Sequence, residues 1–275
     1  MWLISAVVLF VFGFVLSNQP FPASVQDWLE RTFPNDIAGS PKVIALSFLA
    51  GLLIAGSPIH LFGKYLPTVV HELGHSFMMG ILGFRPTKIV LSRDTSGYAD
   101  WDQKEEFHKF RFLVVLASGY PAPVIASVAS VLAVGRGYSQ AWFTFSSAVL
   151  LVALVFLMSN FWGKVWTGIA VVGSYFGLTR LPIENLSMIV VGIAGYLALE
   201  GIRDAKTQLR IIKSGYGEST DAQRIGAILG IKPVTSGRLH RLLVVAIAAG
   251  AAYLAVHPYW SDIRNWVEDQ INSRV

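Results

Sequence analysis

Residues 68–80 read TVVHELGHSFMMG. This stretch is the strongest indication of both fold and chemistry in the chain. In a helix, residues four positions apart project from the same face, so His71 and His75 present both imidazoles on one side. The rest of the segment is apolar. An acidic side chain at the centre of a membrane helix costs about 2.5–3.5 kcal/mol on insertion scales, so it persists only when paired, metal-bound or in contact with water. The segment therefore predicts an apolar helix with a polar site on one face.

The spacing of the two histidines is typical of a zinc site. It allows two ring nitrogens to reach one tetrahedral Zn²⁺ at about 2.0–2.1 Å. Glu72, the next residue along, can then act as general base toward a water whose pKa zinc lowers to near 7. This is the arrangement of HExxH metalloproteases. The alternative is a solvated helix end whose histidines are simply hydrogen-bonded.

The composition places the chain in a membrane. Of its 275 residues, 53% are hydrophobic and only 14% are charged, and the mean hydropathy is +0.54. Soluble domains have about a quarter of their residues charged, so an ordinary soluble enzyme is excluded. The net charge of +5 is typical of cytoplasmic loop anchoring and does not indicate nucleic-acid binding. The absence of cysteine excludes disulfides, cysteine-ligated zinc and thiol catalysis.

The apolar runs predict an all-α polytopic membrane protein with roughly seven or eight membrane segments. Residues 1–17 are uncharged and lack a basic leader, so we expect a retained span and not a cleaved signal peptide. The remaining apolar runs are residues 43–62, the HExxH helix, 113–134, 141–159, 165–177, 186–199 and 242–256.

We expect one integral membrane domain over residues 1–275. N-terminal spans occupy residues 1–65, the HExxH core occupies 66–178 with a charged insert at 85–111, and C-terminal spans occupy 186–275. The segment 200–241 is basic, with eight Lys or Arg from Arg203 to Arg241, so the positive-inside rule places it in the cytoplasm. Residues 18–42 are slightly acidic and are expected outside. Both placements hold only if one run is re-entrant or residues 141–177 are not two full crossings.

The charged insert contains a turn signal at residues 94–97, which read DTSG. Residues 88–90 and 97–99 flank it, so the insert is expected to hold a small β-hairpin directly after the HExxH helix. A plain extramembrane loop is the alternative. The other histidines, His60, His108, His240 and His257, lie near the ends of apolar runs or in the insert. We interpret these as interfacial or capping residues.

Several blocks resemble one protein family. They are VHELGH at 70–75, SRDTSG at 92–97, ASGYPAP at 117–123, SNFWG at 159–163 and STDA at 219–222. In this order the chain resembles the site-2 protease class of intramembrane zinc metallopeptidases, and more closely its bacterial, actinobacterial-type branch described as peptidase M50B-like. The resemblance implies a Zn²⁺ cofactor held by His71 and His75, with Glu72 as the catalytic base. It also implies that one edge of the hairpin pairs with an extended substrate.

The resemblance leaves the third zinc ligand open. Site-2 proteases usually supply an Asp from a Leu-Asp-Gly motif after an Asn block, but the residues after Asn160 read FWGKVWTG and contain no acid. The candidates are Asp221 and Asp94, which lie in matching blocks, and Glu200, whose neighbours form Leu-Glu-Gly. Asn160 itself is expected to position substrate by analogy with the family. A helix-end amide with a local partner is the alternative for that residue.

We therefore expect an intramembrane zinc metalloprotease of the bacterial inner (plasma) membrane, which cleaves a membrane-protein substrate in or near a span. Its surroundings are the lipid bilayer, and an adaptor protein is expected to select the substrate because the chain has no obvious sensor module. Nucleic acid is not an expected partner. The main alternative is a catalytically inactive membrane scaffold that retains the fold. A transporter would require two matching halves, which the sequence does not contain.

Overall fold

The computed structural model describes residues 22–33, 40–58, 60–102, 109–215 and 220–257. The predicted N-terminal span and His108 lie outside these residues. Within them the chain is mostly helical with one two-stranded sheet, as predicted. The elements are α2 (Ala23–Thr32), α3 (Pro41–Gly56), α4 (His60–Gly63), α5 (Tyr65–Ile81), β1 (Pro86–Leu91), β2 (Gly97–Trp101), α6 (Lys109–Ser118), α7 (Pro121–Gly135), α8 (Ser139–Phe156), α9 (Phe161–Arg180), α10 (Ile183–Lys213), α11 (Asp221–Leu229) and α12 (Pro233–Val256).

Three of the described helices, α8, α10 and α12, are long and apolar enough to cross a membrane. The pair α6 and α7 adds a fourth if it is one span, but the two helices meet at an angle of 58°. The bend falls at Gly119 and Tyr120, immediately before the first of two prolines. Such a broken pair is one of the two irregularities that would reconcile the expected placements of the charged segments. The larger number of seven or eight segments stays a prediction.

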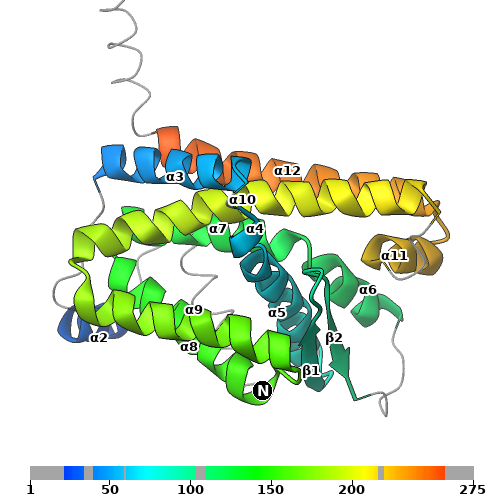
Figure 1. The fold of residues 1–275 in the computed structure, drawn as a ribbon, viewed down its shortest axis with the longest axis horizontal. Helices are drawn as coiled ribbons and strands as arrows, with labels where there is room; N and C mark the ends of the chain where they lie inside the picture. Colours follow the sequence, from blue (N-terminus) through cyan, green and yellow to red (C-terminus); the bar gives the residue numbers. More distant parts are fainter. Residues whose placement is uncertain (1–21, 34–39, 59, 103–108, 216–219, 258–275) are drawn as a thin grey trace, which may run out of the picture.

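The helices α3, α10 and α12 lie side by side, and the α8–α9 hairpin lies on the opposite side of the molecule (Figure 1). The main core is formed where α3, α7, α10 and α12 meet. Contact between α3 and α10 is close because glycines face it. A Cβ atom at Gly51 would overlap the carbonyl oxygen of Gly192, and one at Gly195 would overlap that of Phe48. Small residues allow such backbone approach in membrane proteins.

The basic segment 200–241 is more regular than a cytoplasmic loop. It forms the end of α10, all of α11 and the beginning of α12. Helix α10 has 31 residues, which corresponds to about 46 Å at 1.5 Å per residue. This exceeds the roughly 30 Å of the hydrocarbon core, so α10 is long enough for its polar end to extend past a bilayer that it crosses. There α11 follows, capped at its start by the Thr220 side chain, and it ends at Gly230 with a φ of 67°.

The predicted hairpin is present. Strands β1 and β2 pair antiparallel, with Ile89 opposite Ala99. The other edge of β1 is covered, because the Ile89 N–H donates to the Leu157 carbonyl (2.7 Å) and the Ser159 N–H donates to the Ile89 carbonyl (3.1 Å). Among the described residues no strand pairs with the other edge of β2. Strand β2 as a whole packs against α5.

The hairpin turn is attached to the beginning of α5. The Tyr65 hydroxyl donates to the Arg93 carbonyl (2.9 Å), and the Thr68 hydroxyl donates to the Thr95 carbonyl (2.9 Å). Thr95 has a φ of 68°, a conformation that costs energy for a β-branched residue, and the bond from Thr68 helps to hold it. Helix α5 and β2 therefore run together toward the HExxH residues.

Candidate metal centre

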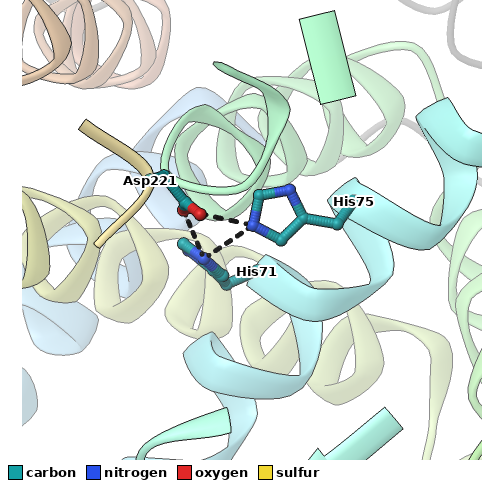
Figure 2. Close-up of side chains that lie close together, drawn as sticks. All are labelled: His71, His75 and Asp221. Atoms are coloured by element: carbon teal, nitrogen blue, oxygen red, sulfur yellow. Dashed lines mark hydrogen bonds and ion pairs between the residues drawn. The ribbon is translucent and has the colours of Figure 1, made fainter. Parts of the chain in front are cut away.

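Helix α5 places His71 and His75 one turn apart on one face, as the spacing predicts. Their Nε2 atoms are 3.1 Å apart, and the two rings are nearly perpendicular at 83°. Figure 2 shows both rings pointing toward the same carboxylate. That carboxylate belongs to Asp221, the first residue of α11. Its Oδ2 atom is 3.5 Å from the Nε2 of His71 and 3.2 Å from the Nε2 of His75.

These separations fit a zinc ion. Donor atoms bound to one tetrahedral Zn²⁺ at 2.0–2.1 Å lie about 3.3 Å from one another, and the three measured separations lie on either side of this value. The tautomer of His75 also fits, because its Nδ1 is 2.7 Å from the Val115 carbonyl oxygen, which can only accept. The proton therefore lies on Nδ1, and Nε2 of the neutral ring keeps a lone pair for a metal. His71, His75 and Asp221 form the one three-ligand cluster among the described residues.

The charge state of Asp221 suits the same role. Burial tends to raise the pKa of its carboxyl group, but without a metal the charge of a protonated His75 and the hydrogen bonds from the protonated nitrogens of His75 and His71 outweigh burial. The pKa is therefore held well below its usual value. An ionised carboxylate is the form that coordinates a metal.

The other two candidate third ligands lie elsewhere. Asp94 stays in the exposed hairpin turn, where its Oδ1 accepts from the backbone N–H (3.0 Å) and the hydroxyl (2.7 Å) of Ser96. These bonds lower the pKa of Asp94. Glu200 is fully buried in α10 and pairs with Arg203 at 2.6 Å. Arg203 also donates to the Ala55 carbonyl at the end of α3. The fold thus brings Asp221, and neither Asp94 nor Glu200, to the two histidines.

Glu72 is 4% exposed and lies between the cluster and β2. Its side chain contacts the strand backbone at Ala99. A Cβ atom at Gly97 would lie 3.1 Å from the Glu72 Oε1 atom, so a side chain at that point of the strand would press on Glu72. Glu72 and the three cluster residues all line a cavity of about 190 Å³. A general base must lie within hydrogen-bond reach of a water beside the reacting carbonyl, and Glu72 is placed for that role.

Asn160 precedes the first residue of α9, and both its amide oxygen and its amide nitrogen bond to the protein backbone. The Oδ1 atom accepts from the N–H groups of Leu91 (3.1 Å) and Gly163 (3.2 Å), and Nδ2 donates to the Leu91 carbonyl (2.7 Å). Asn160 therefore caps α9 and fixes the end of β1. The substrate-positioning role predicted for it stays a prediction, and the geometry favours an action through the hairpin.

Three further residues of the centre were not recognised from the sequence. Gly119 predicts only a helix break, but a Cβ atom there would overlap the Nε2 of His75 and lie 2.7 Å from the Nε2 of His71. Tyr120 lines the cavity with its ring edge-on to His71 at 4.5 Å. His240 is not interfacial. It is 6% exposed and lies against Tyr120, with ring centroids 5.8 Å apart. The ASGYPAP block was the one signal that pointed to this region.

A family model described as Peptidase M50B-like matches residues 43–255, which is well over half of the chain and includes every residue of the cluster. The chain belongs to the Peptidase M50B-like family. This membership confirms the resemblance to the site-2 protease class, whereas the actinobacterial-type branch stays a prediction. M50-family peptidases depend on zinc, and the cluster is where this M50B-like protein can hold a metal ion. No curated protein and no solved structure matches the chain.

Proposed function

We propose that this M50B-like protein is an intramembrane zinc metallopeptidase that hydrolyses a peptide bond in or near a membrane span of a protein substrate. The observation that carries the proposal is the convergence of His71, His75 and Asp221, with Glu72 on the same cavity wall. Two imidazole nitrogens and one carboxylate leave a fourth position open, as catalytic zinc sites do.

In the proposed reaction, Glu72 accepts a proton from the attacking water at a carboxylate oxygen. The water oxygen bonds to the scissile carbonyl carbon, the C–N bond breaks, and Glu72 returns the proton to the leaving amine. Zinc, when bound, supplies Lewis acidity toward the water and the carbonyl oxygen. His71, His75 and Asp221 hold that ion, and the Val115 carbonyl keeps the His75 ring in place.

The substrate is proposed to bind as an extended strand along β2. A peptide must leave its helical conformation before its backbone can be attacked, and strand addition supplies hydrogen bonds to an unwound backbone. Among the described residues no strand pairs with the outer edge of β2, and Gly97, Tyr98, Ala99 and Trp101 of this strand line the cavity. Met79, Phe112 and Leu116 complete an apolar wall, which suits the apolar side chains of a membrane span.

The setting proposed for this activity is the bacterial inner membrane, crossed several times by the chain. The three or four apolar helices support a membrane location. Roughly seven or eight membrane segments, an actinobacterial-type lineage and an adaptor protein that selects the substrate belong to the same proposal. These finer points rest on the apolar runs and on the resemblance to site-2 proteases.

The test combines metal analysis with cleavage, using the full chain purified in detergent. Wild type is expected to hold about one zinc per chain, and His71→Ala/His75→Ala is expected to hold none. Glu72→Gln should retain the zinc, because Glu72 is not in the cluster. In liposomes with single-span reporter proteins, it should cleave on the order of 10²–10⁴-fold more slowly than wild type, the usual contribution of a general base.

Two results would contradict the proposal. Wild type that holds no zinc after reloading would reject the metal centre. Zinc-loaded wild type that cleaves no faster than Glu72→Gln across the reporter panel would instead support the inactive scaffold. Mass spectrometry of the reporter fragments would locate the cleaved bond relative to the span.

A further inference from the structure

The two histidines of the cluster differ in the hydrogen bond made by Nδ1, the ring nitrogen that does not face the cluster. His75 donates its Nδ1–H to the Val115 carbonyl. For His71, Nε2 faces the cluster and the ring packs against Tyr120, but no residue in the described part of the chain accepts from Nδ1. Metal-binding histidines almost always donate this second N–H to a carboxylate, a carbonyl or a water, which fixes the ring. The outer partner of His71 is therefore the missing part of the centre.

Helix α10 brings one carboxylate, that of Asp204, toward His71. Gly201 packs on the first turn of α7, where its Cβ would lie 2.9 Å from Val124 and 3.7 Å from Pro123. Asp204 follows Gly201 by three residues, on nearly the same helix face, and so lies alongside the α6–α7 corner. That corner carries Tyr120, whose ring packs on His71. The Asp204 carboxylate interacts electrostatically with His71 and with Lys64 at the start of α5.

The other carboxylates near His71 are already engaged. Asp221 faces both imidazoles, and Glu72 contacts β2 at Ala99. Glu200 pairs with Arg203 through Oε1, beside the end of α3, and its Oε2 has no hydrogen bond. Asp204 is half-buried and has neither a hydrogen bond nor a salt bridge within the residues that the structure covers. Its carboxylate is therefore available to His71, with which it interacts electrostatically.

We propose that Asp204 is the outer partner of His71. Its carboxylate accepts the Nδ1–H of His71 through one bridging water and thereby holds the ring with Nε2 toward Asp221 and His75. Asp204 is a positioning residue that acts through His71. This inference rests on the proposed function only in assigning the cluster to zinc. Loss of an outer partner typically lowers metal affinity by about 10–100-fold.

The experiment measures zinc affinity of the full-length protein in detergent by competition with a chromogenic chelator. Asp204→Asn is expected to bind zinc about 10–100-fold more weakly than wild type, and Asp204→Glu, which restores a carboxylate, should bind more tightly than the Asn variant. Glu184→Gln is the matched control, because it removes an acidic charge from an exposed position at the start of the same helix. It should bind zinc as wild type does.

Cobalt gives a second readout that a purely structural role would not change. The visible absorption bands of the Co²⁺-loaded protein report ligand geometry, so they should shift in Asp204→Asn and stay unchanged in Glu184→Gln. An Asp204→Asn protein with zinc affinity within twofold of wild type and an unchanged cobalt spectrum would overturn the inference, even if it unfolds more easily. If the Asn variant fails to elute like wild type in gel filtration, Asp204→Ser provides the same comparison.

The outcomes also separate this inference from the proposed function. If His71→Ala/His75→Ala abolishes zinc binding and Asp204→Asn leaves it unchanged, only the role of Asp204 is rejected. If wild type itself binds no zinc, both are rejected.

Discussion

Asp221 reaches the two histidines because of how α11 packs and not because of its place in the sequence. It begins α11, where the Thr220 hydroxyl accepts from the Gln223 N–H. Ala222, the next residue, is fully buried and lies near Gly237 at the beginning of α12. The carboxylate is therefore fixed by a helix cap on one side and by helix packing on the other. A ligand held this rigidly is expected to matter for affinity.

We expect Asp221→Asn to weaken zinc binding by more than about 100-fold, because it removes one of the three residues that contact the metal. The loss of a residue that only hydrogen-bonds to such a ligand costs about 10–100-fold. Asp94→Asn should bind zinc as wild type does, since Asp94 bonds only within its own turn. Chelator competition on the purified proteins checks both. Equal affinity in wild type and Asp221→Asn, with weaker binding in Asp94→Asn, would move the third ligand to the hairpin.

Gly119 shapes the centre by having no side chain. A methyl group there would occupy the space of the His75 Nε2 atom and press on the Nε2 of His71. We expect Gly119→Ala to lose most of its bound zinc while remaining folded, as measured by elemental analysis and circular dichroism. Gly250→Ala in α12 is the control, because nothing lies within 4 Å of its added Cβ. Full zinc occupancy in Gly119→Ala would show that the turn between α6 and α7 can shift away from the histidines at little cost.

Among the elements, the hairpin depends on contacts from both sides. Tyr65 and Thr68 of α5 hold its turn, and Asn160 at the start of α9 holds the end of β1. The free edge of β2 is thus kept beside Glu72 by two helices. Releasing one of these attachments should disturb the substrate strand without touching the metal ligands.

We expect Asn160→Ala to keep its zinc but to cleave single-span reporters on the order of 10²-fold more slowly, because displacement of a bound peptide by about 1 Å has an effect of this size. Loss of the cap also destabilises α9 by about 0.5–2 kcal/mol, which thermal unfolding would detect. Ser159→Ala is the neighbouring control, since its hydroxyl makes only one long bond of 3.3 Å. Unchanged cleavage in Asn160→Ala would argue against the hairpin as the substrate site.

The features that could be predicted from the sequence are those set by residues close together in the chain. The shared face of His71 and His75 follows from helix geometry, and the hairpin follows from the turn at residues 94–97. What could not be predicted depends on contacts between distant segments. The choice of Asp221 over Asp94 and Glu200, and the burial of His240 beside Tyr120, both require α11 and α12 to pack on the α6–α7 corner. No local pattern records that packing.

For the whole molecule, the position of the metal centre along the membrane normal follows from α10. Helix α11, which carries Asp221, packs on α12 and α6 and lies by the basic end of α10 in Figure 1. By the positive-inside rule, we expect the eight Lys and Arg from Arg203 to Arg241 to hold this end in the cytoplasm. The centre is therefore expected near the cytoplasmic boundary of the bilayer and not at its middle.

The absence of cysteine makes this orientation testable in the otherwise unchanged chain. Single cysteines at Lys213 and Glu184 mark the two ends of α10, and both positions are exposed. A membrane-impermeant maleimide should label Lys213→Cys only in inverted vesicles, where the cytoplasmic face is outward, and Glu184→Cys only in intact spheroplasts. Because α10 is about 46 Å long, the two ends cannot share one side if the helix crosses the membrane. Reversed labelling would place the metal centre, and any product released from it, on the extracytoplasmic side. Labelling of both positions from one side would mean that α10 is not a span at all.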